Sequence, residues 1–333
     1  MKSVSVLGAG TWGTALAIHL ANKGMEVKMW SKLEKELEGL AADRSQVPNL
    51  PGAVLPDSIV LTSDLADACG SAELIVCAVA SPYVRSTAQL MKEYCREGQI
   101  IVNVGKGIED GTLMTLTQIL SEELPMTKVA VLSGPSHAEE VSRGIPTAVV
   151  CGSEDEDIAK TVQEVFFSDR FRVYTSDDVL GIELGGSLKN VIALAAGMID
   201  GIGYGDNTKA ALMTRGIAEI SRLGEAMGGK ESTFYGLSGI GDLIVTCTST
   251  HSRNHNAGYL IGQGKSMQEA MDEVHQVVEG VYSAKAALAL GEKYGVNLPI
   301  VQEINDILFH GESVGDSILE LLRRNPTDEY RRK

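Results

Sequence analysis

Three closely spaced glycines near the amino terminus constrain this chain most. Residues 4–17 read Val-Ser-Val-Leu-Gly-Ala-Gly-Thr-Trp-Gly-Thr-Ala-Leu-Ala, so an alternating apolar stretch ends at Leu7 and Gly8, Gly10 and Gly13 follow at once. A strand, a glycine turn and a helix in this order are typical of a dinucleotide-binding fold. Gly8 permits the turn, Gly10 leaves room for a pyrophosphate, and Gly13 lets the helix pack closely on the strand. The other interpretation is a glycine-rich turn that binds no ligand.

The overall composition is that of a soluble globular protein. The chain has 333 residues, of which 44% are hydrophobic and 22% charged, and no apolar run approaches the ~20 residues that span a bilayer. Residues 1–3 lead directly into the first strand, so we expect no signal peptide and a cytoplasmic location. The five cysteines are scattered without CxxC spacing, which predicts reduced thiols, no disulfide framework and no metal site.

The charge balance limits the kinds of partner. A formal net charge of −15 would repel phosphates at long range, so we expect no nucleic-acid partner. An anionic dinucleotide would need local lysines, arginines and helix N-termini to hold it against the same field. These local cations are therefore the candidate binding residues.

The order of predicted elements indicates an α/β part followed by an all-helical part. Helices are expected between several of the strands, for example at 86–95 and 113–124, which makes the sheet mostly parallel. From Asp177 onward helical patterns dominate, so we expect a Rossmann-type dinucleotide-binding domain over residues 1–180 and an all-α substrate-binding and catalytic domain over 181–333. An apolar helical domain also fits a homodimer. The further predicted strands are 26–30, 59–61, 74–79, 100–104, 129–132, 148–151 and 171–174.

The residues after the strand at 26–30 bear on the ribose of the cofactor. Dinucleotide folds that bind NAD usually carry an acidic residue there, whereas this chain has Ser31 and Lys32, with Lys35 nearby. A hydroxyl and ammonium groups suit a 2′-phosphate, so this segment favours NADPH with NADH tolerated. Alternatively, both lysines are solvated residues at a helix start.

Two other strand ends carry unusual chemistry, and ligands in such folds collect at the carboxyl ends of strands. Lys106 stands between two glycines just after the strand at 100–104. After the next strand the chain reads Ser-Gly-Pro-Ser-His-Ala-Glu-Glu over 133–140, which predicts an anion-binding helix start with Pro135 at its first position. We interpret His137 as a polar residue of the first helical turn rather than as a general base.

A lysine interrupts an otherwise apolar helix. Residues 183–199 are apolar almost all round, as in a buried central helix, and Lys189 stands within them. Its neighbours at helical spacing include no acid and are mostly small, so this lysine is expected to project into a pocket with nothing on its own helix to neutralise it. A lysine that snorkels to the surface is the alternative.

The segment 238–256 offers a carboxylate and a phosphate site. Asp242 lies in a glycine-rich turn, and Ser252 is a credible N-cap that would place Arg253 and Asn254 in the first turn of a helix. A hydroxyl, a guanidinium, an amide and a positive helix end together suit a phosphate, although a solvated loop is the other interpretation. His251 and His255 lack a third ligand nearby, so no metal site is expected.

In combination these motifs closely resemble the bacterial NAD(P)-dependent glycerol-3-phosphate dehydrogenases over nearly the whole chain. The motifs are the glycine fingerprint, Gly105-Lys106-Gly107, Ser133-Gly134-Pro135-Ser136, the run 183–191, Gly241-Asp242-Leu243 and Ser252-Arg253-Asn254.

The resemblance implies a Rossmann-type domain followed by a helical domain. The implied activity is reversible hydride transfer between NADH or NADPH and dihydroxyacetone phosphate, which yields sn-glycerol 3-phosphate for phospholipid synthesis. It also implies Lys189 as the catalytic lysine. The implied substrate contacts are Lys106, Gly134, Ser136, Lys189, Asp242, Ser252, Arg253 and Asn254. The implied cofactor contacts are Thr11, Trp12, Lys32, Lys106, Ala138, Arg253, Val277 and Glu279. They add to Gly8, Gly10 and Gly13 of the glycine turn.

Two departures from the family pattern stand out. Ser31-Lys32 replaces an arginine or histidine that is frequent there, which leaves the preference between NADH and NADPH open, and Ala80-Ser81-Pro82 replaces a more usual Pro-Ser pair beside the nicotinamide. A β-hydroxyacid dehydrogenase or a ketopantoate reductase relative is an alternative with the same plan, acting on carboxylates. A non-catalytic NAD(P)-sensing protein is a third.

The implied reaction also suggests how the lysines act. Lys106 and Lys189 would lower each other's pKa if they converged on one substrate, and Asp242 would orient Lys189 or hold a substrate hydroxyl.

Overall fold

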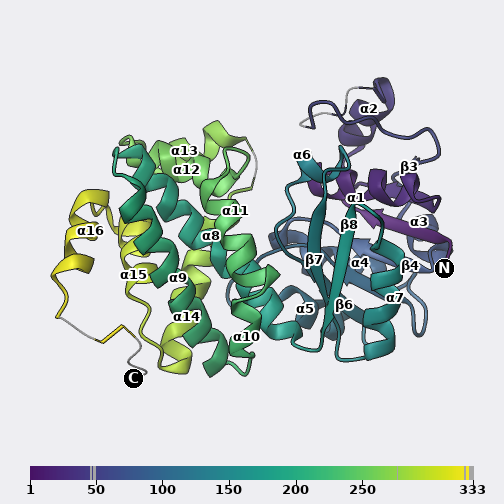
Figure 1. Ribbon diagram of the computed structural model, residues 1–333. Coiled ribbons are helices and arrows are strands. Elements are labelled where there is room, and N and C mark those ends of the chain that lie inside the picture. The colour runs from purple at the N-terminus through teal and green to yellow at the C-terminus, as the bar shows by residue number, and fades with distance from the viewer. Residues whose placement is uncertain (46, 48–49, 276, 326–327, 330–333) are drawn as a thin grey trace.

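The structure is a computed structural model that describes residues 1–45, 47, 50–275, 277–325 and 328–329. Strands and helices alternate up to Ser176, and only helices follow from Val179 onward within the described residues. We call residues 1–176 the sheet half and residues 179–325 the helical half. Figure 1 shows the two halves side by side, with α8, α10 and α11 on the side of the helical half that faces the sheet.

The sheet half is built on one eight-stranded sheet with the order β3-β2-β1-β4-β5-β6-β7-β8. Only β7 runs antiparallel to its neighbour β6, and the other neighbouring pairs are parallel. The expected mostly parallel sheet is therefore confirmed, and each strand lies within two residues of its predicted bounds. The strands are β1 Ser3–Leu7, β2 Glu26–Trp30, β3 Val60–Thr62, β4 Leu74–Cys77, β5 Ile100–Asn103, β6 Lys128–Ser133, β7 Thr147–Gly152 and β8 Phe171–Ser176.

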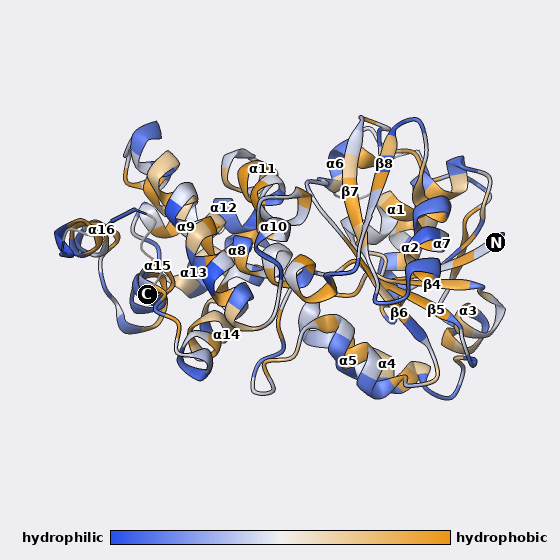
Figure 2. Cartoon of the chain, turned by 60° about the horizontal axis from the view of Figure 1, so that its bottom comes forward, coloured by the Kyte–Doolittle hydropathy of each residue, from blue (hydrophilic) through white to orange (hydrophobic). Residues whose placement is uncertain are grey.

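Helices cover both faces of this sheet, so its central strands are largely apolar. Every residue of β4 and of β5 is buried, as expected of parallel strands covered on both sides. Figure 2 shows these strands as a continuous hydrophobic layer. The helices of the sheet half are α1 Thr11–Asn22, α2 Glu34–Ala42, α3 Leu65–Ser71, the 3-10 turn η1 Ser81–Tyr83, α4 Val84–Met91, α5 Leu116–Glu123, α6 Ala138–Val141 and α7 Glu156–Phe166.

Local sequence explains several helix starts, and one prediction at such a start is wrong. Asp155 caps α7 by accepting hydrogen bonds from the backbone N–H groups of Asp157 and Ile158. After β6, the helix was expected to begin with Pro135, but α6 begins at Ala138 with His137 as its N-cap. The Ser136 hydroxyl instead donates a hydrogen bond to the Gly134 carbonyl at 3.0 Å, so these residues form a tight turn that delays the helix.

The helical half is organised around α8, which spans 23 residues and is buried from Gly181 to Ile199. This confirms the expected central helix. The helices around it are α9 Asp206–Ala226, α10 Glu231–Phe234, the π-helical turn η2 Leu237–Gly241, α11 Asp242–Thr248, α12 Arg253–Gly262, α13 Met267–Val274, α14 Glu279–Tyr294, α15 Pro299–Asn305, the π-helical turn η3 Asp306–His310 and α16 Val314–Arg323, with α8 at Val179–Gly201.

Helix α8 alone among the described helices has the length and hydropathy of a membrane-spanning segment. Its most apolar window has a mean hydropathy of 1.4, but 89% of that window is buried inside the protein. The apolar surface of α8 is therefore covered by its neighbouring helices.

Glycines allow α8 and α12 to pack with their main chains in contact. A Cβ atom at Gly197 would lie 1.9 Å from the His255 carbonyl oxygen, and one at Gly258 would lie 1.9 Å from the Leu194 carbonyl oxygen. No side chain fits at either position without moving a backbone. This crossing places the N-terminus of α12 beside the middle of α8, where Lys189 and Asn190 lie.

Candidate functional site

Two lysines share one buried aspartate where the two halves meet. The Lys189 ammonium lies 2.8 Å from Asp242 Oδ1, and the Lys106 ammonium lies 2.5 Å from Asp242 Oδ2. Lys189 also donates to the Thr246 hydroxyl, and Lys106 donates to the Gly134 carbonyl oxygen at 3.0 Å. The fold therefore brings together four of the residues that the sequence predicted, namely Lys106, Gly134, Lys189 and Asp242.

Each member of this cluster comes from a different part of the chain. Lys106 and Gly134 follow β5 and β6, which are neighbours in the sheet and run parallel, so both loops leave the same edge. Asp242 is the first residue of α11, and Lys189 lies halfway along α8. The cluster therefore forms where the carboxyl ends of strands face the helical half, the expected place for a ligand in an open α/β sheet.

Burial and charge set the proton affinities in this cluster. Lys189 is 5% exposed and Asp242 is 1% exposed. Burial lowers the pKa of Lys189 to about 8, and the charge of Lys106 adds to this effect while Asp242 opposes it. Burial alone would raise the pKa of Asp242, but the charges of Lys106 and Lys189 outweigh it, so that pKa is lowered. The site thus holds a carboxylate and a lysine whose pKa is lowered toward neutral pH.

Helix α8 also fixes the loop that carries Lys106. The Asn103 amide donates to the Gly105 carbonyl and to the Glu183 carboxylate, at 3.2 and 3.1 Å, and the Ser187 hydroxyl donates to the Gly107 carbonyl at 3.2 Å. Residues on one face of α8 therefore hold the loop on both sides of its lysine. The sequence pattern did not indicate these supports. Glu183, an acid inside an apolar helix, is the residue that could have pointed to them.

The expected N-cap at the second cluster of polar residues is confirmed. Ser252 precedes α12, and its side chain accepts a hydrogen bond from the His255 backbone N–H at 3.2 Å. Arg253 is the first residue of α12 and its side chain is exposed. The helix start therefore offers a guanidinium and backbone N–H groups side by side.

The buried Asn254 side chain already forms two hydrogen bonds within the protein. Its Oδ1 atom accepts from the Gly280 backbone N–H at 2.8 Å, and its Nδ2 atom donates to Asn190 Oδ1 at 2.9 Å. One of the two Nδ2 hydrogens remains for another acceptor. Asn254 thus joins α12 to α8 and α14, a role that the sequence did not indicate.

The glycine turn after β1 packs closely on the backbone around it. The Gly8 backbone N–H donates to the Trp30 carbonyl at 2.8 Å. A Cβ at Gly8 would lie 2.6 Å from the Ala78 carbonyl oxygen, and one at Gly13 would lie 2.1 Å from the Gly8 carbonyl oxygen, so both positions require glycine. Gly10 caps α1 without a side-chain hydrogen bond, and nothing lies within 4 Å of where its Cβ would be. The N–H groups of Thr11 and Trp12 stand in the first turn of α1, where the helix itself offers no acceptor.

The polar residues after β2 differ in their surroundings. Ser31 is buried, and its hydroxyl donates a hydrogen bond to Glu36 Oε2 at 2.6 Å. Lys32 is exposed. The hydroxyl that the sequence assigned to a cofactor phosphate is therefore bonded to a carboxylate, which the sequence analysis had not considered.

A second contact between the halves involves Glu279 at the start of α14. Its carboxylate accepts from the Ser81 backbone N–H at 3.2 Å and from the Ser81 hydroxyl at 2.5 Å. Burial raises the pKa of Glu279, although the bonds to Ser81 oppose this. Of the other expected cofactor contacts, Val277 precedes α14 and Ala138 begins α6.

The remaining polar candidates are histidines. His137 Nε2 lies 3.4 Å from the Val245 carbonyl oxygen, and burial together with the charge of Lys189 lowers the pKa of His137. His255 Nε2 lies 2.8 Å from Asp200 Oδ2. The described residues include no group of three or more His, Cys, Asp and Glu side chains arranged to hold a metal ion.

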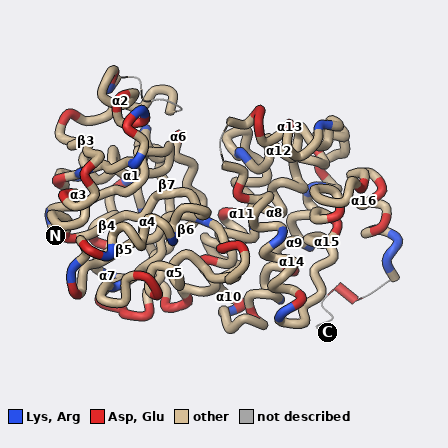
Figure 3. Tube along the Cα trace, turned by 180° about the vertical axis from the view of Figure 1, so that it is seen from behind, with Lys and Arg blue, Asp and Glu red and all other residues tan. Residues whose placement is uncertain are grey.

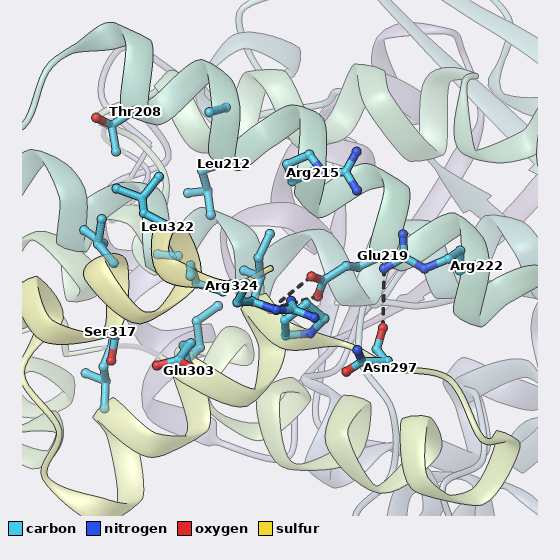
Figure 4. Close-up of a pocket in the computed structure, with 18 of the residues that line it drawn as sticks. Thr208, Leu212, Arg215, Glu219, Arg222, Asn297, Glu303, Ser317, Leu322 and Arg324 are labelled. Carbon is cyan, nitrogen blue, oxygen red and sulfur yellow. Dashed lines mark hydrogen bonds between the residues drawn. The ribbon is translucent and has the colours of Figure 1, made fainter. Parts of the chain in front are cut away.

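A cavity of about 1150 Å³ lies elsewhere, between α9, α15 and α16. Figure 4 shows Arg215, Glu219 and Arg222 along α9 at this cavity, with the Glu219 carboxylate bonded to the backbone of the neighbouring helix. Those bonds come from the N–H groups of Ile300 and Val301, so Glu219 covers the N-terminus of α15. None of the predicted site residues lines this cavity.

Glu219 makes stability depend on pH. It is 3% exposed, and burial raises its pKa to about 7. Because the folded pKa is raised, the contribution of Glu219 to stability is greatest below its unfolded pKa and is lost as pH rises through 7, by about 3 kcal/mol in all.

We expect Glu219→Gln to flatten the pH dependence of the unfolding free energy between pH 4.5 and 7.5. Chemical denaturation across this range tests it, with exposed Glu97→Gln as the control, and equal slopes in both variants would contradict it.

Comparisons with known proteins agree with this geometry. Residues 3–159 match the sequence profile of the NAD-dependent glycerol-3-phosphate dehydrogenase N-terminus, and residues 178–319 match that of the C-terminus. The glycerol-3-phosphate dehydrogenase [NAD(P)+] of Agathobacter rectalis is 56% identical over 330 residues, which are 99% of this chain and 98% of that protein.

Solved structures show the same relationship. A glycerol-3-phosphate dehydrogenase from Coxiella burnetii is 36% identical and superposes with a TM-score of 0.93, covering 97% of this chain and 99% of that one. A ketopantoate reductase from Ralstonia eutropha has a TM-score of 0.62 at 16% identity, covering 96% of this chain and 100% of that chain, and shares the fold alone. The two sequence profiles cover one half each and the relatives span both, so the chain belongs to the NAD-dependent glycerol-3-phosphate dehydrogenase family.

Proposed function

We propose that Lys189 is the catalytic residue in the reversible NAD(P)H-dependent reduction of dihydroxyacetone phosphate to sn-glycerol 3-phosphate, the activity for which the family is named. The observation that carries this proposal is the Lys106–Asp242–Lys189 cluster, with ammonium-to-carboxylate distances of 2.5 and 2.8 Å. It supplies a buried acid at the carboxyl ends of β5 and β6.

The residues around the glycine turn suit an NAD(P) cofactor. The free N–H groups at the start of α1 suit a pyrophosphate, and the open space at Gly10 leaves room for it. When bound, the reduced nicotinamide supplies the hydride. We propose that the cofactor is held by Gly8, Gly10, Thr11, Trp12, Gly13, Lys32, Lys106, Ala138, Arg253, Val277 and Glu279.

Lys189, Lys106 and Asp242 carry out the remaining steps of the proposed reaction. The Lys189 ammonium polarises the substrate carbonyl and then gives its proton to the oxygen that becomes the alcohol. A pKa of about 8 keeps this lysine mostly protonated at neutral pH yet makes it a better donor than an exposed lysine. Asp242 orients the ammonium, and Lys106 adds positive charge beside the developing oxyanion. In the oxidation direction the neutral amine accepts the proton.

The start of α12 is the proposed anchor for the substrate phosphate. Ser252, Arg253 and Asn254 supply a hydroxyl, a guanidinium and one amide hydrogen at a positive helix end. We assign the remaining substrate contacts to Lys106, Gly134, Ser136 and Asp242. Fixing the phosphate at α12 would hold the carbonyl carbon at a set place relative to Lys189.

Arg253→Ala tests the phosphate anchor. We expect it to raise KM for dihydroxyacetone phosphate by about tenfold or more with a smaller change in kcat, because a charge-assisted contact to the phosphate is lost. Steady-state rates at saturating cofactor measure both constants. Arg170→Ala, at an exposed position in the sheet half, is the matched control. An unchanged KM in Arg253→Ala would mean that the phosphate binds elsewhere.

The reaction is tested most directly by comparing substrates. Initial rates of NADPH and NADH oxidation are measured with dihydroxyacetone phosphate, unphosphorylated dihydroxyacetone and ketopantoate. Fast turnover with the phosphorylated ketone alone is expected. Faster turnover with ketopantoate would support the carboxylate-reducing alternative, and tight cofactor binding without turnover on any ketone would support a sensing protein.

We also propose a domain boundary, a cellular location, an oligomeric state and a biological role. We place the boundary between the dinucleotide-binding and substrate-binding domains near residue 180, since β8 ends at Ser176 and α8 begins at Val179. All five cysteines are free thiols, four of them buried, which suits a reducing cytoplasm. We further propose a homodimer that supplies glycerol 3-phosphate to phospholipid synthesis.

A further inference from the structure

We infer that Glu36 selects NADH over NADPH. This inference rests on the proposed function, because it concerns the ribose of the cofactor that the glycine turn would hold. It also opposes the NADPH preference that Ser31 and Lys32 indicate on sequence alone. Four hydrogen bonds at the end of β2 support this inference.

The end of β2 is fixed beside the pyrophosphate turn. The Gly8 N–H donates to the Trp30 carbonyl at 2.8 Å, so the glycine turn and the last residue of β2 are joined through the backbone. Ser31 follows directly, and its N–H donates to the Thr62 carbonyl at 3.4 Å. In dinucleotide folds the residue after β2 faces the adenosine ribose. Groups bonded to Ser31 therefore lie at the ribose 2′ position.

The hydroxyl of Ser31 is not free to bind a phosphate. It donates its single proton to Glu36 Oε2 at 2.6 Å and accepts a hydrogen bond from the Leu33 N–H at 3.1 Å. A phosphate oxygen needs a donor, and a hydroxyl has one proton to give. The Glu36 carboxylate, by contrast, keeps free acceptor sites that suit a ribose hydroxyl. Ser31 thus positions a carboxylate where the sequence had placed a phosphate-binding hydroxyl.

The charge around this point also disfavours a 2′-phosphate. Figure 3 shows acidic and basic positions mixed along α2. Within residues 31–38 the two lysines, Lys32 and Lys35, are outnumbered by Glu34, Glu36 and Glu38. Lys32, Lys35 and Glu36 are all exposed, so solvent screens each of these charges. Glu36 is the one whose side chain is held against the buried Ser31 by a hydrogen bond.

A pair of matched variants tests this inference. Glu36→Gln removes the charge and keeps the shape, whereas Glu38→Gln makes the same change at an exposed residue on the same helix. Calorimetry gives the Kd of each protein for ADP-ribose and for 2′-phospho-ADP-ribose, and steady-state kinetics give kcat/KM for NADH and NADPH. Circular dichroism confirms that both variants fold.

The wild type is expected to bind ADP-ribose more tightly than its 2′-phosphate. In Glu36→Gln the ratio of the two Kd values, and of kcat/KM for NADPH and NADH, should move toward the phosphorylated form by about tenfold, against about twofold or less in Glu38→Gln. Equal ratios in the two variants, or a wild type that prefers the 2′-phosphate, would overturn the inference. The binding arm needs no turnover, so it judges Glu36 even if dihydroxyacetone phosphate proves not to be the substrate.

Discussion

Replacing Lys189 with methionine is expected to lower kcat for dihydroxyacetone phosphate reduction by about a thousandfold or more, because both the proposed proton donor and its charge are lost. Methionine fills a similar volume without a charge. The Kd for NADH, measured by calorimetry, should change by about threefold or less, since Lys189 belongs to the helical half and the glycine turn to the sheet half. Lys160→Met, at an exposed residue of α7, is the control.

The pH profile of the wild type gives a second view of Lys189. Its pKa is lowered to about 8, and ketone reduction needs the protonated form. The kcat/KM for reduction should therefore be flat below pH 8 and fall above it, while that for alcohol oxidation should rise through the same range. Near-normal turnover in Lys189→Met, or a reduction rate that does not fall above pH 8, would remove Lys189 from its proposed role.

Asp242→Asn is expected to have the second-largest effect. The change leaves Lys106 and Lys189 together without a counter-charge in a buried site, so kcat should fall by about a hundredfold and the unfolding free energy by about 3 kcal/mol. Since the pKa of Asp242 is lowered in the folded protein, its stabilising effect is present at neutral pH and is lost as pH falls through that lowered pKa. Denaturant unfolding at pH 7 measures the stability term.

A pH shift separates the catalytic effect of Asp242 from a folding defect. Without the carboxylate, burial and Lys106 lower the pKa of Lys189 further, so the fall in reduction rate should begin at a lower pH than in the wild type. Asp57→Asn, at an exposed loop position, should change neither the rate nor the profile. A profile in Asp242→Asn identical to that of the wild type would show that Asp242 does not act on Lys189.

Sequence reasoning succeeded wherever the cause is local. The glycine turn, each strand and the Ser252 cap depend on residues within a few positions of one another, so their spacing is visible in the chain. Lys189 stood out because a charge inside an apolar helix is unusual. The fold class and these parts of the candidate site were therefore predictable.

The rest depends on residues that are far apart or on side-chain choice. Lys189 and Asp242 are 53 positions apart, and no local pattern shows that both lysines bind the same carboxylate. The Asn254 bridge to Asn190 and Gly280 is non-local in the same way. At Ser31, the sequence shows a hydroxyl but not its partner, which is Glu36 in the first turn of the next helix. The helix start predicted at Pro135 is wrong because a tight turn replaces the first helical turn there.

Asp242 and Lys189 both belong to the helical half, whereas Lys106 belongs to the sheet half. The contact between Lys106 and Asp242 therefore joins the two halves, and the bonds from Asn103 to Glu183 and from Ser187 to Gly107 join them beside it. Because the charge of Lys106 lowers the pKa of Lys189, a group of the sheet half adjusts the acidity of a lysine in the helical half. The acidity of the proposed proton donor therefore depends on how the two halves pack against each other.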